Sequence, residues 1–533
     1  MKRLPAAAVP LRFRGRLRRL HPDHVIAARA FDAVFYARTY PDVAEVGADP
    51  LDHFMTYGWR EGRDPSPDFS VRAYLEAFPD VAESGLNPFV HFLTSGRPTT
   101  VRPESPQGFR YEVIERLKPV EDRIDATLDP VSPEADLAAA LAQSPSQLAR
   151  LHVTFSHDDY SANLGGLQFA IRREAARLEE QGRDHLHLYS ARPWPVVRTA
   201  ADPGVLGVVW NGRPVGLFTP AVIARALGEA AAPGGQGRSF AIHSLLGHAA
   251  DETADILAAV GLTDGVFWLH DFASLCAGFH LLRNDVEDCA APPPESAACG
   301  VCVYGPWRAR HTEAHARLFQ RLRLTVAAPS QVTLDLWTRA SGLLAAGTVV
   351  LPHATLAARE PAPAVASDRP LRVAYAGLPV AHKGWPIFRN LVARFAADPR
   401  YEFHDLGARG DAALPATFQP VTAGAANPLA MRDALEAAEI DAVLIWPLCR
   451  ETFSFVAYEA VAAGCAVITG PDSGNVAAFV AETGHGRVLD EAALTAAFES
   501  GAILDLGRAR RAPMLYDLDY SALTLDLAPT ASA

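Results

Sequence analysis

The sequence predicts an α/β protein with two doubly wound, parallel-sheet domains preceded by a small α-helical module. Two patterns lead to this class: a 38-residue repeat near the N-terminus, and an alternation of strand-like and helix-like segments that runs through residues 149–356 and restarts at 371. The composition, 49% hydrophobic and 21% charged over 533 residues, is that of a globular chain long enough for about three domains.

Residues 1–30 form a basic segment. Seven cations precede the first acidic residue, Asp23: Lys2, Arg3, Arg12, Arg14, Arg16, Arg18 and Arg19. The segment lacks the long apolar core of a secretory signal. We expect a solvated tail on a cytoplasmic protein, with peripheral contact to the inner face of the membrane as the alternative. No apolar run approaches the length of a membrane span, and the formal charge of -12 disfavours a nucleic-acid partner.

Residues 31–98 contain two copies of a helical unit. The segment that starts at Phe31 recurs 38 residues later at Phe69, with Tyr36, Pro41, Asp42, Val43, Ala44, Gly47, Pro50, His53, Phe54 and Gly58 matching Tyr74, Pro79, Asp80, Val81, Ala82, Gly85, Pro88, His91, Phe92 and Gly96. Each copy reads as a helix, a Pro-Asp turn, a glycine stop and a second helix, too small to bury its apolar face alone. We expect the copies to pack together and to bind a protein partner.

A Pro- and Ser-rich linker, 99–148, leads to two α/β domains. The first, 149–356, has strand-like runs such as "LHVTF", "FAIHS" and "GVFWLH", and the second, 357–505, has "LRVAYAG", "DAVLIWP" and "CAVITG". Residues 357–371 read as the hinge between them, and 506–533 as a C-terminal tail. Ligands of such sheets bind beyond the carboxyl ends of the strands, so candidate site residues are those that follow each strand.

Two carboxylates follow "DAVLIWP" within "ETFSFVAYEA". The helix is expected to begin near Phe453, with Thr452 or Ser454 as its cap, so that Glu451 precedes the first turn and Glu459 lies two turns on. Eight residues advance a helix by about 12 Å, which suits an extended, hydroxyl-rich ligand better than an acid and base acting on one bond. The positive end of the helix, at Phe453 and Ser454, could lie near a diphosphate.

The segment "ETFSFVAYEAVAAGCAVI" resembles the E-x7-E segment of the retaining, nucleotide-sugar-dependent glycosyltransferases of family 4, and the resemblance extends over about 150–500. It implies the GT-B fold, with an acceptor domain at 149–356 and a donor domain at 357–505. In that family the first glutamate contacts the donor sugar and the second the ribose, roles that would fall to Glu451 and Glu459. The resemblance implies a nucleotide-diphosphate sugar as donor and no catalytic metal.

The loop "AGLPVAHKGW" is similar to the family's diphosphate loop. It follows the strand that ends at Gly377, and Lys383 fits the family's lysine, but Leu378 stands where the family has an arginine. The diphosphate charge would then be under-compensated, and Arg450 is a candidate to supply part of it.

Other candidates lie at strand ends of the first domain. Gly165 and Gly166 open a helix after the first strand, where the backbone can approach a ligand, as in the family's glycine loop. The resemblance suggests that His270 faces the donor sugar, with a histidine satisfied within the fold as the equal alternative. Ser330 and His353 sit at similar positions with less support.

Four cysteines cluster in a proline-rich stretch: Cys276, Cys289, Cys299 and Cys302. The last two have C-x-x-C spacing, but no second such pair exists. Free or loosely paired thiols are the main expectation, and a structural zinc is the alternative.

The expected function is transfer of a sugar to an acceptor hydroxyl with retention. The N-terminal repeats look like those found beside bacterial surface-polysaccharide glycosyltransferases, which suggests a glycan or lipid-linked acceptor in the cell envelope. Three alternatives stay open: a catalytically decayed GT-B scaffold acting through its repeats, a nucleotide-sugar epimerase, and a general nucleotide-binding Rossmann protein, although "SANLGGLQ" lacks the G-x-G-x-x-G turn of the last.

Overall fold

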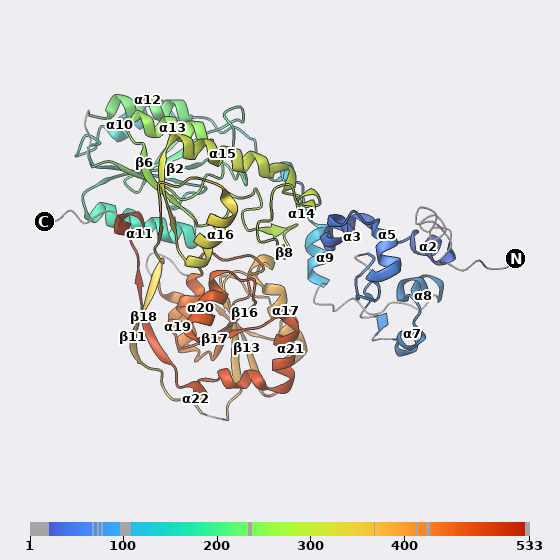
Figure 1. The fold of residues 1–533 in the computed structure, drawn as a ribbon. Helices are drawn as coiled ribbons and strands as arrows, with labels where there is room; N and C mark the ends of the chain where they lie inside the picture. Colours follow the sequence, from blue (N-terminus) through green and yellow to red (C-terminus); the bar gives the residue numbers. More distant parts are fainter. Residues whose placement is uncertain are drawn as a thin grey trace. The chain divides into compact units, whose positions relative to one another are not determined.

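The computed structural model describes residues 21–66, 69–71, 74–75, 78–95, 108–232, 237–366, 368–411, 414–422 and 427–527. They form two compact units (Figure 1). One unit is Met1–Leu117 with Arg283–Val286 and Pro292–Pro306, and the other is Lys118–Leu282, Glu287–Ala291 and Trp307–Ala533. The seven cations of the basic segment lie outside the described residues.

The first unit is a helical module. Its elements are α2 (Pro22–Ala27), α3 (Ala33–Thr39), α4 (Pro41–Glu45), α5 (Pro50–His53), the π-helical turn η2 (Phe54–Gly58), α7 (Pro79–Ser84), α8 (Pro88–Ser95) and α9 (Gly108–Glu115). Proline at the first helical position starts α2, α4, α5 and α7, where its missing N–H costs nothing.

The two repeat copies make the same buried contact. A tyrosine hydroxyl and a histidine ring are hydrogen bonded in each, at 3.0 and 2.9 Å: Tyr36 with His53, and Tyr74 with His91. Phe54 of one copy and Phe89 of the other lie 5.9 Å apart between ring centroids in a shared core. These histidines are therefore packing residues of the module.

The module also includes a segment from far along the chain. Helix α14 (Ala297–Gly300) packs on α4 within this unit. These residues were expected in the first α/β domain, because nothing local in a proline-rich loop indicates its packing partner.

The second unit begins with an eight-stranded sheet in the order β10-β9-β6-β5-β1-β2-β3-β4. Six strands pair in parallel: β1 (Leu151–Ser156), β2 (Asp184–Ser190), β5 (Ser239–Ile242), β6 (Asp264–Trp268), β9 (Arg323–Ala328) and β10 (Gly347–Val350). Helices α12 (Pro220–Ala230), α13 (Ala250–Ala259) and α15 (Arg308–Arg321) lie on one side of it, and α11 (Gly166–Glu180) and α16 (Gln331–Ser341) on the other (Figure 1).

Two features of this domain differ from expectation. Strands β3 (Leu206–Trp210) and β4 (Arg213–Phe218) form an antiparallel hairpin whose turn, Asn211-Gly212, has φ values of 45° and 75°. Asn-Gly between apolar runs indicates a β-hairpin, but the predicted alternation of strands and helices did not include one here. In addition, the end of the expected linker forms α10 (Glu134–Leu141), which packs on α12 and β4 and buries Leu137 in the core.

A six-stranded, fully parallel sheet follows, in the order β14-β13-β12-β15-β16-β17. Its strands are β12 (Leu371–Ala376), β13 (Tyr401–Gly407), β14 (Thr417–Pro420), β15 (Ala442–Leu444), β16 (Ala466–Thr469) and β17 (Gly486–Val488). The helices are α17 (Trp385–Phe395), α18 (Ala430–Ala437), α19 (Phe455–Ala462), α20 (Asn475–Thr483) and α21 (Glu491–Ser500). Its central strands β12, β13, β15 and β16 are largely buried, as expected of parallel strands that are covered by helices on both faces.

An antiparallel ribbon connects the two domains. Strand β11 (Ala354–Pro361) pairs with β18 (Met514–Tyr520), and the chain then returns to the first sheet, where α23 (Thr524–Leu527) packs on α11. Residues 357–361 of the expected hinge and 514–520 of the expected tail therefore pair as strands. The predicted fold class is confirmed: GT-B, with two Rossmann-like domains and an N-terminal helical module. No helix in the described ranges is long and apolar enough to cross a membrane.

Candidate functional site

Two of the predicted site residues meet at the carboxyl ends of neighbouring strands. After β12, Gly377 leads into the short helix η5 (Ala381–Lys383), and after β15 the chain runs to Glu451. The ammonium of Lys383 forms an ion pair with Oε1 of Glu451; the side chains are 43% and 13% exposed. Burial lowers the pKa of Lys383, but the Glu451 carboxylate outweighs that effect, so the net pKa is raised and the lysine stays charged.

Gly384 makes this approach of the two loops feasible. Its φ is +85°, and a Cβ there would lie 2.0 Å from the carbonyl oxygen of Trp446. Only glycine accepts both conditions, so the backbone can pass close to the end of β15 and bring Lys383 over Glu451.

The backbone of Glu451 is held on both sides. Its N–H donates to the Ser473 carbonyl at 3.3 Å, and its carbonyl accepts from the Asn475 N–H at 2.8 Å. The carboxylate is thus presented from a fixed main chain, which favours a defined geometry toward a ligand.

Helix α19 begins at Phe455, two residues later than predicted, and Ser454 at its N-cap makes no side-chain capping bond. Thr452 does not cap either: its hydroxyl donates to the His270 carbonyl at 2.9 Å, and its own carbonyl accepts from the Ser330 hydroxyl at 2.9 Å. Both bonds cross to the first Rossmann-like domain. Thr452 is thus bonded to the first domain and does not cap the helix.

Phe453 and Phe455 continue this contact between domains. Phe453 is 8% exposed and lies 5.1 Å from the His353 ring, and Phe455 lies 5.3 Å from the Phe169 ring of α11, both between centroids. A Cβ on Gly166 would lie 3.5 Å from the Phe455 ring, so the glycine loop faces the start of α19. Gly165 precedes it with an extended backbone.

Glu459 lies apart from the ion pair. It is 7% exposed on α19, burial raises its pKa to about 7, and the Arg432 guanidinium on α18 partly offsets that rise. Burial raises the pKa of Tyr520 on β18, and the charge of the Glu459 carboxylate adds to that rise. No hydrogen bond or ion pair among the described residues joins Glu459 to Lys383 or Glu451, and their convergence on one ligand stays a prediction.

The histidine predicted to face the donor sugar is already engaged at both ring nitrogens. Nε2 of His270 is 2.8 Å from Nδ1 of His243, and Nδ1 is 3.2 Å from Nε2 of His353. A direct contact with a sugar would require breaking one of these bonds, so that role also stays a prediction.

Arg450 is paired rather than free. Its guanidinium forms a bidentate ion pair with Asp288, at 2.7 and 2.8 Å, and Asp288 is 9% exposed. This ion pair therefore opposes the predicted role of Arg450 in compensating the charge of a diphosphate. Leu378 is 53% exposed, and the loop presents no second cation at that position.

None of the four clustered cysteines forms a disulfide within the described part of the chain, and each is half-buried. Cys276 and Cys289 pack against the core of the first Rossmann-like domain, whereas Cys299 and Cys302 belong to the unit of the helical module. Among the described residues, no group of three or more His, Cys, Asp or Glu side chains is arranged to hold a metal ion.

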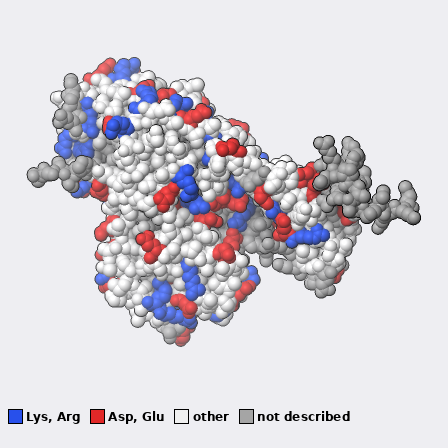
Figure 2. Space-filling model, viewed as in Figure 1, with Lys and Arg blue, Asp and Glu red and all other residues white. Residues whose placement is uncertain are grey.

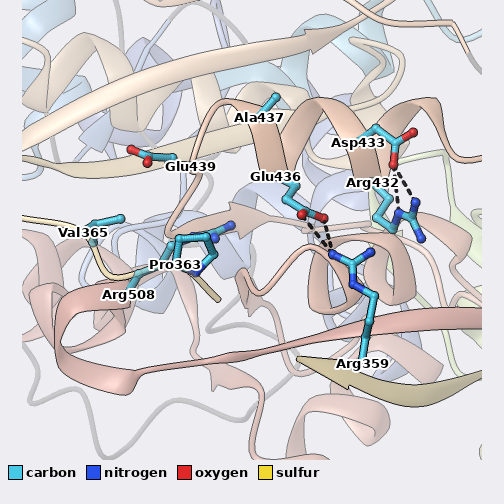
Figure 3. A pocket seen from close by; sticks show the side chains of 9 residues that line it. All are labelled: Arg359, Pro363, Val365, Arg432, Asp433, Glu436, Ala437, Glu439 and Arg508. Carbon is cyan, nitrogen blue, oxygen red and sulfur yellow. Dashed lines mark hydrogen bonds and ion pairs between the residues drawn. The ribbon is translucent and has the colours of Figure 1, made fainter. Parts of the chain in front are cut away.

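A pocket of about 470 Å³ lies elsewhere in the second Rossmann-like domain (Figure 3). Arg359 pairs with Glu436 at 2.9 Å and Arg432 with Asp433 at 2.7 Å, so its charges are largely compensated. Over the face drawn in Figure 2, basic and acidic side chains are likewise interspersed. The pocket does not include Lys383 or Glu451.

Two buried polar residues of the first Rossmann-like domain were not predicted from the sequence. Glu174 of α11 is 0% exposed and His243, after β5, is 1% exposed. The available signal for Glu174 was a carboxylate on the apolar face of an amphipathic helix, one turn after Ala170 and Ile171. Such a residue is rarely buried without a partner.

No protein-family model matches the sequence, and no curated protein matches it. Among solved structures, the chain is similar to sucrose-phosphate synthase from Thermosynechococcus elongatus, at 14% identity and a TM-score of 0.43, over 68% of this chain and 92% of that one. It is also similar to HepE from Anabaena in complex with UDP-glucose, at 13% identity and a TM-score of 0.40, over 68% of this chain and 93% of that one. A third similar structure is WaaG, a glycosyltransferase involved in lipopolysaccharide biosynthesis, at 12% identity and a TM-score of 0.37, over 68% of this chain and 94% of that one. The assignment of the fold rests on the sheet topology described above.

Proposed function

We propose that this protein is a retaining glycosyltransferase that moves a sugar from a nucleotide-diphosphate sugar to an acceptor hydroxyl, in the synthesis of a bacterial cell-surface polysaccharide. The observation that carries the proposal is the Lys383–Glu451 ion pair at the carboxyl ends of β12 and β15, beside the start of α19. A parallel sheet of this kind binds ligands at that edge.

The ion pair is suited to exchange partners. An arriving diphosphate would attract the Lys383 ammonium and release the Glu451 carboxylate, which could then accept hydrogen bonds from sugar hydroxyls. The same ammonium and the first amides of α19 would stabilise negative charge on the departing nucleotide. The acceptor would approach from the Gly165-Gly166 loop. No side chain is assigned as a covalent nucleophile, so retention is proposed through attack on the same face, with the leaving phosphate taking the hydroxyl proton.

Glu459 is proposed to contact the ribose. A carboxyl with a pKa near 7 is partly protonated at neutral pH and can both donate to and accept from a vicinal diol. The neighbouring guanidinium of Arg432 favours the ionised form.

The test is a thermal-shift screen of the full chain with UDP-, GDP- and ADP-sugars, followed by proton NMR of the product formed with candidate glycan and lipid-linked acceptors. Stabilisation by one nucleotide series and a product of unchanged anomeric configuration are expected. Binding with an inverted product would refute retention alone, whereas absence of binding across all three series would refute the proposal.

One alternative has an observation in its favour. Leu378 supplies no charge, and Arg450 is neutralised by Asp288, as expected of a decayed site whose helical module recruits partners. Calorimetric binding of a nucleotide sugar without hydrolysis or transfer over a panel of acceptors would favour this scaffold.

A further inference from the structure

The pocket of about 470 Å³ in the second Rossmann-like domain contains none of the residues to which the proposed function gives a role, Lys383, Glu451 and Glu459 among them (Figure 3). It is lined by residues of α18, of β11 and the segment that follows it, and of α22 (Arg508–Arg511). Its volume falls within the range of about 300–1,000 Å³ that is typical of small-molecule sites. The charges on its walls indicate what it can hold.

Arg508 brings a buried positive charge to the pocket without an acid beside it. The residue is 3% exposed. Its Nε donates to the Ile440 carbonyl at 2.8 Å and its Nη2 to the Ala463 carbonyl at 2.5 Å, and Nη2 also lies 3.8 Å from Sγ of Cys465. None of these partners is a carboxylate, and the guanidinium forms no ion pair within the described ranges. Buried guanidinium groups are almost always paired with an acid, so the charge of Arg508 is under-compensated.

One nitrogen of this guanidinium is available to a ligand. A guanidinium has five N–H donors, two of them on Nη1. Nη1 of Arg508 makes no hydrogen bond with the part of the chain that the structure describes, and Arg508 lines the pocket. An anionic group in the pocket would accept charge-assisted hydrogen bonds from Nη1 and would supply the missing negative charge.

The other charges of the pocket leave acceptors rather than donors to spare. Its two remaining arginines are each paired with an acid, as described above. Glu439 contacts Arg372 through Oε2 at 3.3 Å, and its side chain is 47% exposed, so Oε1 can accept a hydrogen bond from a ligand. In Figure 3 Glu439 is drawn at the same end of the pocket as Arg508, whereas Asp433 lies at the other end.

A ligand that carries both charges matches these walls. Three arginines and three acids line the pocket, so a dianion would meet three carboxylates and a simple cation would leave Arg508 unpaired. Pro363, Val365 and Ala437 add an apolar surface for an aliphatic side chain. We propose that the pocket binds a free α-amino acid, whose carboxylate accepts from Nη1 of Arg508 and whose ammonium donates to the Glu439 carboxylate. This inference does not rest on the proposed function.

The test is saturation-transfer NMR of the full chain with each of the free amino acids in turn. Acetate, methylamine and inorganic phosphate are the probes that carry one kind of charge alone. At least one amino acid should bind, and more tightly than any of these three probes. Binding of acetate or phosphate as tight as that of the best amino acid would refute the ammonium contact, and absence of binding by every amino acid would overturn the proposal.

Two variants place the binding in this pocket. Ala437 is exposed on α18, so Ala437→Phe fills the pocket without disturbing the core and should abolish binding. Ala393→Phe, an equally exposed change on α17, should leave binding unaltered. Unchanged binding in Ala437→Phe would overturn the site.

Two further variants test the charges. Glu439→Gln should weaken amino-acid binding by about tenfold and leave acetate binding unchanged, and equal affinities in Glu439→Gln and the wild-type chain would refute the ammonium contact. Arg508→Gln should abolish binding of the amino acid, but it also removes bonds to two main-chain carbonyls. Its melting temperature is therefore compared with that of the wild-type chain, and Ala437→Phe decides the proposal if Arg508→Gln is unfolded.

Discussion

Lowering the pH from 7 to 5.5 should destabilise the first Rossmann-like domain far more than the second. Burial lowers the pKa of seven histidines of the first domain to about 3 or about 4: His152, His185, His248, His280, His311, His315 and His353. The unfolded chain takes up these protons below about pH 6.5 and the folded chain does not. The stability is therefore fully present above pH 6.5 and is lost as the pH falls toward the folded pKa values.

The size of the effect follows from linkage. Each ring costs about 1.2 kcal/mol of the free energy of unfolding between pH 7 and 5.5, and the seven together cost on the order of 9 kcal/mol. Asp271, whose pKa burial raises to about 6, acts in the opposite direction by about 1 kcal/mol. The net loss is comparable with the whole stability of a typical domain, about 5–15 kcal/mol.

The second domain has compensating groups. Burial raises the pKa of Asp405 to about 6 and that of Glu459 to about 7, so the folded state gains protons, and stability, as the pH falls. Burial lowers the pKa of His404 and His485, which opposes that gain. We therefore expect a change of only about 1–2 kcal/mol in this domain.

Urea titrations at each pH, read by pulsed hydrogen exchange and mass spectrometry, report peptides of the two sheets separately. His311→Gln should reduce the pH dependence of the first domain by about 1.2 kcal/mol, because the site no longer titrates. Leu318→Ala, on the same helix and 0% exposed, should lower stability by about 3 kcal/mol at every pH and leave the slope unchanged. A loss below about 2 kcal/mol in the wild-type first domain, or an unchanged slope in His311→Gln, would contradict the reasoning.

Three further changes test the site and its support. Lys383→Met should weaken nucleotide-sugar binding at least about tenfold by calorimetry. Arg450→Met breaks an ion pair between domains and should mainly lower the melting temperature. The reverse pattern would show that Arg450, and not Lys383, binds the diphosphate. Leu378→Arg should strengthen binding of the free nucleoside diphosphate by about tenfold at low salt and by less at high salt. An effect that does not depend on salt would exclude a charge contact between the new arginine and the diphosphate. Gly384 has a φ of +85°, and an added Cβ would lie 2.0 Å from a backbone oxygen, so Gly384→Ala should lower the free energy of unfolding in urea by about 3 kcal/mol. Gly182→Ala, where nothing lies near the added Cβ, should lower it by about 1 kcal/mol. Equal losses for the two variants would argue against the close contact at Gly384.

The sequence alone determined the fold class and the position of one charge pair. Strand and helix periodicities are local, so two alternating blocks were enough to predict two parallel sheets. Lys383 and Glu451 could be placed together because both follow strands of one sheet, and the carboxyl ends of parallel strands share an edge. The N-terminal repeat could also be recognised from the sequence, because its matched residues recur at a fixed offset.

Only the tertiary structure decided what surrounds that pair. The pairing of β11 with β18, the ion pair of Arg450 with Asp288 across 162 residues, and the bond from Thr524 to Glu174 across 350 residues join segments with no local sign of each other. Buried polar groups need partners, but the sequence does not say which partner folding brings within reach. Long-range packing therefore gave Thr452 hydrogen bonds to the other domain, where the local sequence predicted a helix cap.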